Sequence, residues 1–334
     1  MELFKSVNVD WMKLKWYFLG FSLIVTVSGL LSIFFWHGVP LGVDFKGGTI
    51  VYVRFNQAPD VEQIRSAVQK AGVKDARIQR YGSAANNEYI IALEQSQTQE
   101  LEKKVAGGDT QANTQALDAG KQTIINALNA SSFAGKYEVR NVEIVGPQVG
   151  AQLRKQALLA TLYSLAGMLT YLAFRFELIY GIAAVVAVFH DTLFTIGVFS
   201  LTNTEISLTV IAALLTLIGY SMNDTIVIFD RIRENLKVMR RESLTEIVNH
   251  SINQTLSRTV LTSGLTFLTV ISLFLFGGPV LHGFSFALVV GILIGTYSSI
   301  AVAAPMLVAY QNRRTQRGSA AQVSNAGRRQ KARA

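Results

Sequence analysis

Four side chains that can carry a charge stand inside long apolar stretches of this sequence: His190, Asp191, Asp224 and Arg258. Such groups are rare there, because an unpaired charge near the centre of a bilayer costs at least about 2.5–3.5 kcal/mol. They are retained where they pair, face a polar cavity or change protonation state, and a carboxylate inside a membrane indicates a path for ions or protons. Each of the four is therefore weighed as a functional group and as a packing residue.

Asp224 is the strongest candidate. It lies in the polar segment Gly219-Tyr220-Ser221-Met222-Asn223-Asp224-Thr225, in which Asn223 is a second polar side chain, and this segment interrupts an apolar helix. Asp224 precedes Asp230 by six residues, or about 9 Å along a helix. Arg258 begins the next apolar stretch, which runs back in the opposite direction. We therefore expect Asp224 and Arg258 at similar depth, where a salt bridge between them is geometrically reasonable.

The Asp224–Arg258 pair predicts a proton-coupled switch. A guanidinium beside a carboxyl group favours the ionised form, and burial favours the neutral acid. If the helices rearrange so that the guanidinium moves away, the carboxylate takes up a proton. The alternative is a static salt bridge that only holds two helices together.

His190 and Asp191 form the second candidate site and lie deeper in their apolar stretch. Consecutive residues on a helix do not face each other, so the two side chains need not pair. Asp191 could carry function, or it could bond Ser and Thr hydroxyls of neighbouring helices and lock the packing, as polar side chains in membranes often do. Both interpretations stay open.

The segment Gly42-Val43-Asp44-Phe45-Lys46-Gly47-Gly48-Thr49 is rich in glycine but lacks the pattern of a phosphate-binding loop and precedes a strand. We interpret Gly42, Asp44, Gly47 and Gly48 as a tight structural turn. The chain has no cysteine, and its Ser, His and Asp residues show no hydrolytic signature. We expect no metal, no cofactor and no enzymatic site, so that any energy must come from an ion gradient or a partner.

These residues sit in a chain with the composition of a membrane protein. Of its 334 residues 50% are hydrophobic and only 16% are charged, against about 25% in an average soluble domain. Residues 16–36 are apolar and long enough to cross a bilayer, and no small-residue cleavage site follows, which predicts an uncleaved anchor. Five more spans are predicted within residues 151–310, near 155–174, 178–200, 206–229, 259–277 and 283–308. The fold class is therefore a multi-pass α-helical membrane protein with six transmembrane helices.

The distribution of basic residues predicts the orientation. The short loops 201–205 and 278–282 contain no Lys or Arg, whereas the loop 230–258 contains six such residues and the tail 311–334 contains seven. By the positive-inside rule, residues 1–15 and the basic, disordered tail are cytoplasmic, and residues 37–150 lie on the other side. The net charge of +9 therefore reflects topology and gives no indication of nucleic-acid binding. This organisation corresponds to a bacterial inner-membrane protein with a periplasmic domain between its first two spans.

Residues 37–150 are predicted to form a small α+β domain. Strands are expected at 49–55, 76–81, 88–93 and 137–145, because these segments alternate or concentrate β-branched and aromatic residues. Helices are expected from Asp60, as N-cap, to residue 71, and at 115–128. The order βαββαβ is the ferredoxin-like pattern. Residues 95–114 are dominated by Gln, Thr, Ala and Gly and are interpreted as a flexible insertion.

The cytoplasmic loop 230–258 carries a helical signal of its own. Ser243 and Glu246 form a capping box, and an apolar stripe follows it at helical spacing. We interpret this loop as an amphipathic helix that lies at the membrane interface.

Taken together, these segments resemble the SecD/SecF family of the bacterial Sec protein translocase, within the resistance–nodulation–division superfamily. The resemblance covers the chain from its first span to about residue 310. It rests on residues 42–49, on Val188-Phe189-His190-Asp191, on residues 218–235 around Asp224, and on Asn253-Gln254-Thr255-Leu256-Ser257-Arg258-Thr259.

The resemblance implies an accessory subunit of protein export that uses the proton motive force to promote translocation and release of exported proteins. It implies that Asp224 is the proton-responsive carboxylate and Arg258 its basic counterpart. It also implies a set of partners: SecD, the SecYEG channel, the translocating unfolded polypeptide and the lipid bilayer, with YajC and YidC as further candidates.

Two alternatives remain open at this stage. The chain could be a proton-coupled half-transporter for lipids or drugs. The presence of twelve spans and two large periplasmic domains would favour this interpretation. It could also be a passive scaffold of the translocon, in which case Asp224 could become Asn without effect.

Overall fold

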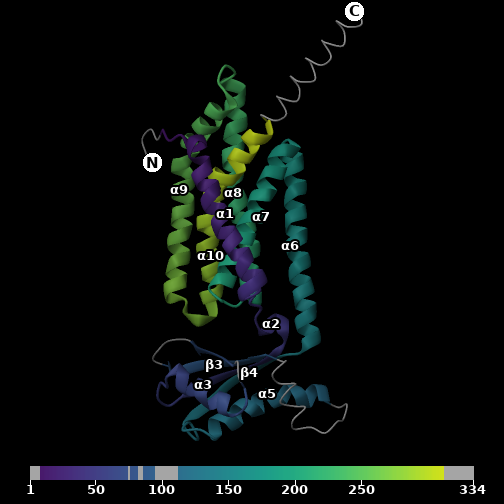
Figure 1. The fold of residues 1–334 in the computed structure, drawn as a ribbon, viewed down its shortest axis with the longest axis vertical. Helices are drawn as coiled ribbons and strands as arrows, with labels where there is room; N and C mark the ends of the chain where they lie inside the picture. The colour runs from purple at the N-terminus through teal and green to yellow at the C-terminus, as the bar shows by residue number, and fades with distance from the viewer. Residues whose placement is uncertain (1–7, 74–75, 82–85, 95–111, 312–334) are drawn as a thin grey trace, which may run out of the picture.

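A computed structural model of the chain describes residues 8–73, 76–81, 86–94 and 112–311. It consists of a bundle of long helices and a small sheet domain at one end of that bundle (Figure 1). The sheet domain is inserted between the first two long helices. The start of α1 and the C-terminal end of the last span, Val280–Gln311, both lie at the opposite end of the bundle.

Among the described residues, six helices are long and apolar enough to cross a membrane, which confirms the predicted number of spans. Two of them continue through a π-helical segment, Ser32–Trp36 after α1 and Ser299–Ala303 after α10. The six helices are α1 (Trp11–Leu31), α6 (Pro147–Arg175), α7 (Leu178–Leu201), α8 (Leu208–Val238), α9 (Leu244–Phe276) and α10 (Gly278–Ser298).

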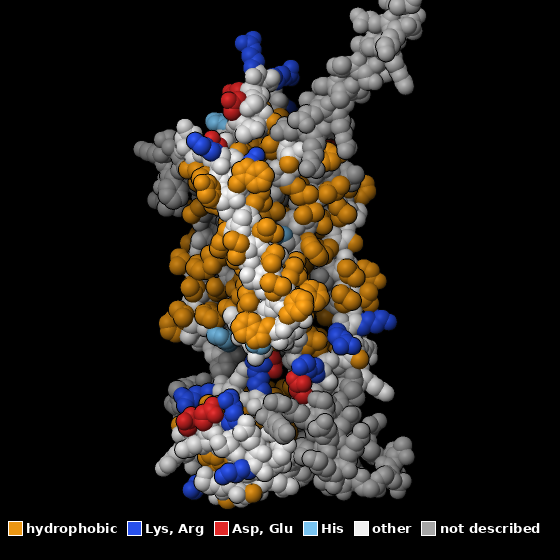
Figure 2. Space-filling view, in the orientation of Figure 1, with side chains coloured by type: hydrophobic (Ala, Val, Ile, Leu, Met, Phe, Trp, Pro, Cys, Tyr) orange, Lys and Arg blue, Asp and Glu red, His pale blue; other side chains and the backbone are white. Residues whose placement is uncertain are grey.

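The surface of the bundle is apolar around its middle. Figure 2 shows hydrophobic side chains along the length of the helices, with charged side chains gathered at the two ends. Large side chains such as Phe174, which is 88% exposed, point outward. A soluble protein rarely exposes so large an apolar surface, whereas a bilayer requires it.

The sheet domain has the predicted βαββαβ order. Its elements are β1 (Gly48–Phe55), α3 (Val61–Lys70), β2 (Arg77–Tyr81), β3 (Glu88–Glu94), α5 (Ala112–Asn129) and β4 (Tyr137–Val145). The strands form one antiparallel sheet in the order β2-β3-β1-β4. This is the ferredoxin-like arrangement, so the fold class predicted from the sequence is confirmed. Most of the expected flexible insertion, residues 95–111, and nearly all of the basic tail lie outside the described residues.

Alternation along β1 builds the core of the sheet domain. Val51, Val53 and Phe55 are buried on one face, and buried side chains of α3 and α5, among them Ile64 and Leu128, pack against them. Asp60 caps α3 as predicted, since its carboxylate accepts a hydrogen bond from the backbone of Glu62. The two helices therefore cover one face of the sheet.

The polar segment 230–258 differs from its predicted form. The capping box of Ser243 and Glu246 is present, but the helix that it starts continues without a break to Phe276. The preceding helix likewise extends to Val238, so that only a short turn separates α8 from α9. The apolar stripe packs on the neighbouring helix, where Val248 and Ile252 are buried beside Ile232. No helix breaker stands between the stripe and the fifth span, which is why no separate interfacial helix forms.

A set of polar contacts, which we call the joint, connects the start of the sheet domain to the turn between α7 and α8. The backbone N–H of Gly42 donates to the carbonyl of Ile206 at 2.9 Å, and the N–H of Ile206 donates to Pro40 at 2.7 Å. Asp44 accepts a hydrogen bond from the N–H of Leu208 at 2.8 Å, at the first turn of α8. One ion pair completes the joint, between Arg77 and Glu205.

Two glycines allow the chain to turn from the joint into the sheet. Gly47 has φ 77° and Gly48 has φ 149°, a region that favours glycine. A side chain at Gly48 would also overlap the carbonyl of Leu93 on the paired strand. These glycines follow the short helix α2 (Val43–Lys46). The segment predicted as one tight turn therefore contains a single helical turn, and the chain reverses at Gly47 and Gly48.

The crossing of α1 and α7 yields a first prediction. A Cβ added to Gly29 would stand 2.7 Å from the Cα of Gly197, which is backbone and cannot move aside. Gly29→Ala is expected to destabilise the fold by about 1–3 kcal/mol, the usual cost of overpacking, and to lower the thermal unfolding midpoint in detergent. The matched control is Gly20→Ala, because Gly20 has open space around it. Equal midpoints for the two variants would contradict a close crossing at Gly29.

Candidate functional site

Asp224 is buried in the middle of the helix bundle, with 2% of its surface exposed. Its Oδ2 atom accepts a hydrogen bond from the Ser263 hydroxyl on α9 at 2.7 Å and another from the Thr296 hydroxyl on α10 at 3.2 Å. Three helices therefore meet at this carboxyl group through side-chain hydroxyls.

Close packing of α8 against α10 places Asp224 there. Side chains added at Gly291 and Gly295 would overlap Leu217 and Ser221, so these glycines let the two helices approach closely. Leu217, Ser221 and Asp224 follow one another at helical spacing on the buried face of α8. Small residues at helix contacts are the usual device for packing inside membranes.

The expected salt bridge between Asp224 and Arg258 is not formed. None of the ion pairs among the described residues joins them, and Arg258 is exposed. The reason is the rotation of α9 about its axis: Ser263, which faces Asp224, lies five residues beyond Arg258 and therefore about 140° around the helix. The prediction placed Asp224 and Arg258 at similar depth along the bundle, but depth alone does not determine which side chain of α9 points inward.

Asn223, next to Asp224, points to the outside of the bundle. It is exposed, as are Gly219, Thr216 and Ala212, which precede it at intervals of three or four residues. These four residues form an exposed stripe of small and polar residues along α8, which we call the α8 stripe. Asn223 thus does not share the site of Asp224.

A second polar contact links α8 to the π-helical segment after α10. The hydroxyls of Thr225 and Ser299 lie 2.8 Å apart, and both side chains are buried. Just before this segment, α10 contributes Thr296 to Asp224. π-helical turns are frequent at functional sites. Here two hydroxyl-bearing residues at the end of α10, Thr296 and Ser298, and the first residue of the π-helical segment, Ser299, make polar contacts inside the bundle.

The second predicted site is also built from several helices. Contrary to the expectation for consecutive residues, His190 Nδ1 lies 3.0 Å from Asp191 Oδ1. The other carboxylate oxygen accepts hydrogen bonds from Ser221 on α8 and Ser298 on α10, at 2.5 and 2.7 Å. The other ring nitrogen of His190 bonds the hydroxyl of Ser22 on α1. The predicted bonds from Asp191 to neighbouring hydroxyls are therefore present.

The connectivity Ser22–His190–Asp191 matches that of a hydrolytic triad, which the sequence spacing did not indicate. Ser22 is buried, however, and the described pocket that reaches α1 is lined by Trp11 and Phe18 without it. The three residues come from α1 and α7, so their contacts connect these two helices.

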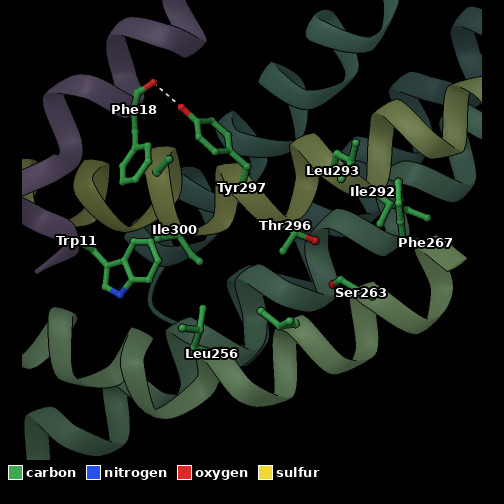
Figure 3. A pocket seen from close by; sticks show the side chains of 13 residues that line it. Trp11, Phe18, Leu256, Ser263, Phe267, Ile292, Leu293, Thr296, Tyr297 and Ile300 are labelled. Atoms are coloured by element: carbon green, nitrogen blue, oxygen red, sulfur yellow. Dashed lines mark hydrogen bonds between the residues drawn. The ribbon is translucent and has the colours of Figure 1, made fainter. Parts of the chain in front are cut away.

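That pocket lies between α1, α9 and α10 and has a volume of about 350 Å³. Figure 3 shows its aromatic and aliphatic walls, with Ser263 and Thr296 among the lining side chains. Both hydroxyls that hold Asp224 therefore border an apolar pocket.

Sequence reasoning did not identify the hydroxyls that surround the two carboxylates, although Ser or Thr partners were one of the two interpretations kept open for Asp191. The available signal was the presence of Ser and Thr in otherwise apolar spans, such as Thr296, Ser298 and Ser299 in the last one. The turn residues Gly42 and Asp44, in contrast, lie at the joint. Leu208, which bonds Asp44, precedes Asp224 by sixteen residues, or about 24 Å along α8.

Comparisons with known proteins give consistent matches. The family model described as protein export membrane protein SecD/SecF, C-terminal, matches residues 124–313, and the model of the SecD/SecF GG motif matches residues 34–59. The protein translocase subunit SecF of Koribacter versatilis is 55% identical over 96% of both chains. That of Calditerrivibrio nitroreducens is 42% identical over 92% of this chain and 96% of the relative.

Solved structures agree with the sequence matches. The crystal structure of SecDF, a translocon-associated membrane protein from Thermus thermophilus, superimposes with a TM-score of 0.74 at 36% identity. It covers 92% of this chain and 39% of that one. SecDF in a super-membrane-facing form gives a TM-score of 0.68 at 35% identity, over 95% of this chain and 40% of that one. This chain thus spans about two fifths of the length of the solved SecDF chains.

Proposed function

This chain belongs to the SecD/SecF family of protein export membrane proteins, and from that premise we propose that it uses a proton gradient, together with SecD, to help exported polypeptides cross the membrane and leave the channel. The six-span bundle and the similarity to protein translocase subunits support this proposal. Asp224 is the residue that takes up and releases the proton, and Arg258 is its basic counterpart in another state of the cycle.

One observation carries this proposal. The Asp224 carboxyl group is buried in a membrane-spanning helix and, within the described part of the chain, has hydroxyls as its partners and no cation at ion-pair distance. A charge held there without a counter-charge is costly, so a group that can gain and lose a proton suits the place. One turn from Ser263 on α9, the buried hydroxyl of Thr259 has no described hydrogen-bond partner and can serve a proton that moves toward Arg258.

SecD is the proposed partner inside the membrane. The α8 stripe of Ala212, Thr216, Gly219 and Asn223 is exposed although it is small and polar, which suits contact with another helix better than contact with lipid. The region that matches this chain makes up 39% of the solved SecDF chain, so that chain contains a further part beside it. SecYEG, YajC and YidC follow from the family resemblance alone.

The sheet domain is proposed to contact exported chains or partner proteins and to perform no catalysis. A hollow of about 520 Å³ lies between α3 and α5 on the helical side of the domain, with Gln63, Lys70 and Phe133 among its walls. Its mixed polar and apolar lining suits a polypeptide better than a small apolar ligand.

The test of this function is export into sealed vesicles that contain the channel, its ATP-driven motor, SecD and this chain. With ATP consumption held constant, an imposed proton gradient is expected to raise the yield of translocated protein, and dissipating the gradient is expected to remove the gain. Vesicles without SecD are the control and should show no gain. An equal yield with and without the gradient in complete vesicles would support a passive scaffold instead.

We also propose that the protein lies in the bacterial inner membrane, with both termini in the cytoplasm and the sheet domain in the periplasm. Basic residues at the end of the bundle opposite the sheet domain, such as Arg233 and Arg240, support this orientation. Because the chain has no cysteine, single cysteines at Asn86 and Arg240 can be labelled cleanly. An impermeant thiol reagent should label the first and spare the second in intact cells. The opposite pattern would reverse the topology.

A further inference from the structure

A partly buried imidazole and a fully buried carboxyl group meet on α7, outside the Asp224 site. His190 and Asp191 contact each other at 3.0 Å. The Asp191 side chain is fully buried, whereas 15% of the His190 side chain is exposed. The imidazole is therefore the member of the pair through which a proton can arrive.

The partners of Asp191 are arranged for a carboxylate. The hydroxyls of Ser221 and Ser298 both donate to its Oδ2 atom. A carboxylate only accepts hydrogen bonds, whereas a protonated carboxyl group needs an acceptor for its own hydrogen. The remaining oxygen faces His190 Nδ1, so a proton shared by the pair is best placed on that nitrogen.

The partner of the other ring nitrogen depends on how many protons the ring carries. In the neutral ring with a proton on Nδ1, Nε2 accepts a hydrogen bond from the Ser22 hydroxyl. In the charged ring both nitrogens donate, so Ser22 must accept and turn its own hydrogen elsewhere. In a helix the usual acceptor lies four residues earlier, which here is the Phe18 carbonyl. That carbonyl already accepts from the Tyr297 hydroxyl of α10, as Figure 3 shows.

We propose that His190 and Asp191 form a second proton-holding site, in which the imidazole carries the proton beside a carboxylate held by two hydroxyls. The inference rests on the proton-driven function proposed above. With the extra proton the pair is neutral, and without it the pair leaves one negative charge inside the membrane. Loading the proton reverses the His190–Ser22 hydrogen bond and changes the contact of α1 with α10.

The second site is connected to Asp224 through α10. This helix supplies Ser298 to Asp191 and Thr296 to Asp224, while α8 carries both Ser221 and Asp224. A displacement of α10 along α8 therefore alters the hydrogen bonds of both carboxyl groups together. α1 has no ionisable residue between Tyr17 and His37. The ionisable side chains of the other helices that pack on α7 are Tyr220, Asp224, Asp230, Arg231, Arg233, Glu234 and Lys237 on α8, His282 and Tyr297 on α10, and Arg154, Lys155, Tyr163, Tyr171 and Arg175 on α6.

Nitrogen-15 NMR of histidine in the full chain, purified with SecD in lipid nanodiscs, tests the pair directly. The His190 signals are identified as those that the His190→Gln variant lacks. We expect a neutral ring with the proton on Nδ1 at high pH and a doubly protonated ring at low pH. Asp191→Asn should remove the doubly protonated signal at the pH values where the parent shows it. Ser28→Ala is the control, because this exposed serine lies on the same helix and its hydroxyl donates to the Ile24 carbonyl, away from the pair; it should keep that signal.

Export provides a second readout that a packing role would not move. Glutamine at position 190 can still bond its neighbours but holds no proton. Gradient-driven export by His190→Gln should therefore have a pH profile displaced from that of the parent, with SecD still bound. The inference is overturned if His190 stays in one protonation state wherever export depends on pH and His190→Gln keeps the parent profile. If instead the parent ignores the gradient, the proposed function fails, and the NMR titration alone decides whether the pair holds a proton.

Discussion

Replacing Asp224 by Asn is expected to abolish the gain in export that a proton gradient produces, while the protein still folds and binds SecD. The amide keeps the shape of the carboxyl group and can still accept from Ser263 and Thr296, but it cannot exchange a proton. The measurement is translocation into vesicles with an imposed gradient at constant ATP consumption. A variant that responds to the gradient as the parent does would refute the proton role of Asp224.

Three further variants test whether the loss is specific to the titrating group at Asp224. Asp230→Asn is the matched control, because Asp230 is exposed on the same helix and makes only a 3.6 Å ion pair with Arg175; it should export normally. Asp224→Glu still titrates and should retain part of the gain. Arg258→Lys keeps the charge but loses the planar donor group, so an intermediate defect is expected. A full loss in Asp230→Asn would show that the effect of Asp224→Asn is not specific.

Removing the sheet domain is expected to abolish the stimulation of export and to leave insertion of the six spans intact. Gly48, the first residue of β1, pairs directly with Val145, the last residue of β4, so the two ends of the domain lie side by side. A deletion of residues 49–144 can therefore be closed with a short linker, and it keeps Gly42 and Asp44 of the joint in place. Export and membrane insertion are measured in the same cells.

The control for the deletion replaces the domain instead of removing it. A ferredoxin-like domain of unrelated sequence, joined at Gly48 and Val145, preserves the geometry of the spans and removes the proposed contact surface. It should be as inactive as the deletion. Normal export by either variant would show that the sheet domain does not take part.

Local patterns predicted much of this fold. The alternation in β1, the N-cap Asp60 and the capping box of Ser243 each appear where the sequence placed them. They are local because the signal and the structure that it specifies involve the same few residues. The number of spans followed from length and hydropathy, for the same reason.

The geometry of the sites was less predictable. An apolar span is hydrophobic on all sides, so no periodicity indicates which face turns inward, and Ser263 faces Asp224 where Arg258 was expected. The sequence also left the His190–Asp191 contact open, because helical geometry separates consecutive Cβ atoms but not the ends of longer side chains. Such contacts depend on how the helices rotate and pack, a property of the whole bundle.

The joint between the sheet domain and α8 limits how force can pass through the molecule. Its three hydrogen bonds and the Arg77–Glu205 ion pair contribute about 0.5–1.5 kcal/mol each. One proton that crosses 100 mV releases about 2.3 kcal/mol. This free energy is comparable to the summed contribution of the contacts in the joint, and in the proposed function it drives export. A conformational change that broke the contacts of the joint would use that free energy to break them and leave little for export. The sheet domain and α8 are therefore expected to move as one rigid unit, so that a displacement at Asp224 would reach the surface proposed to contact the exported chain.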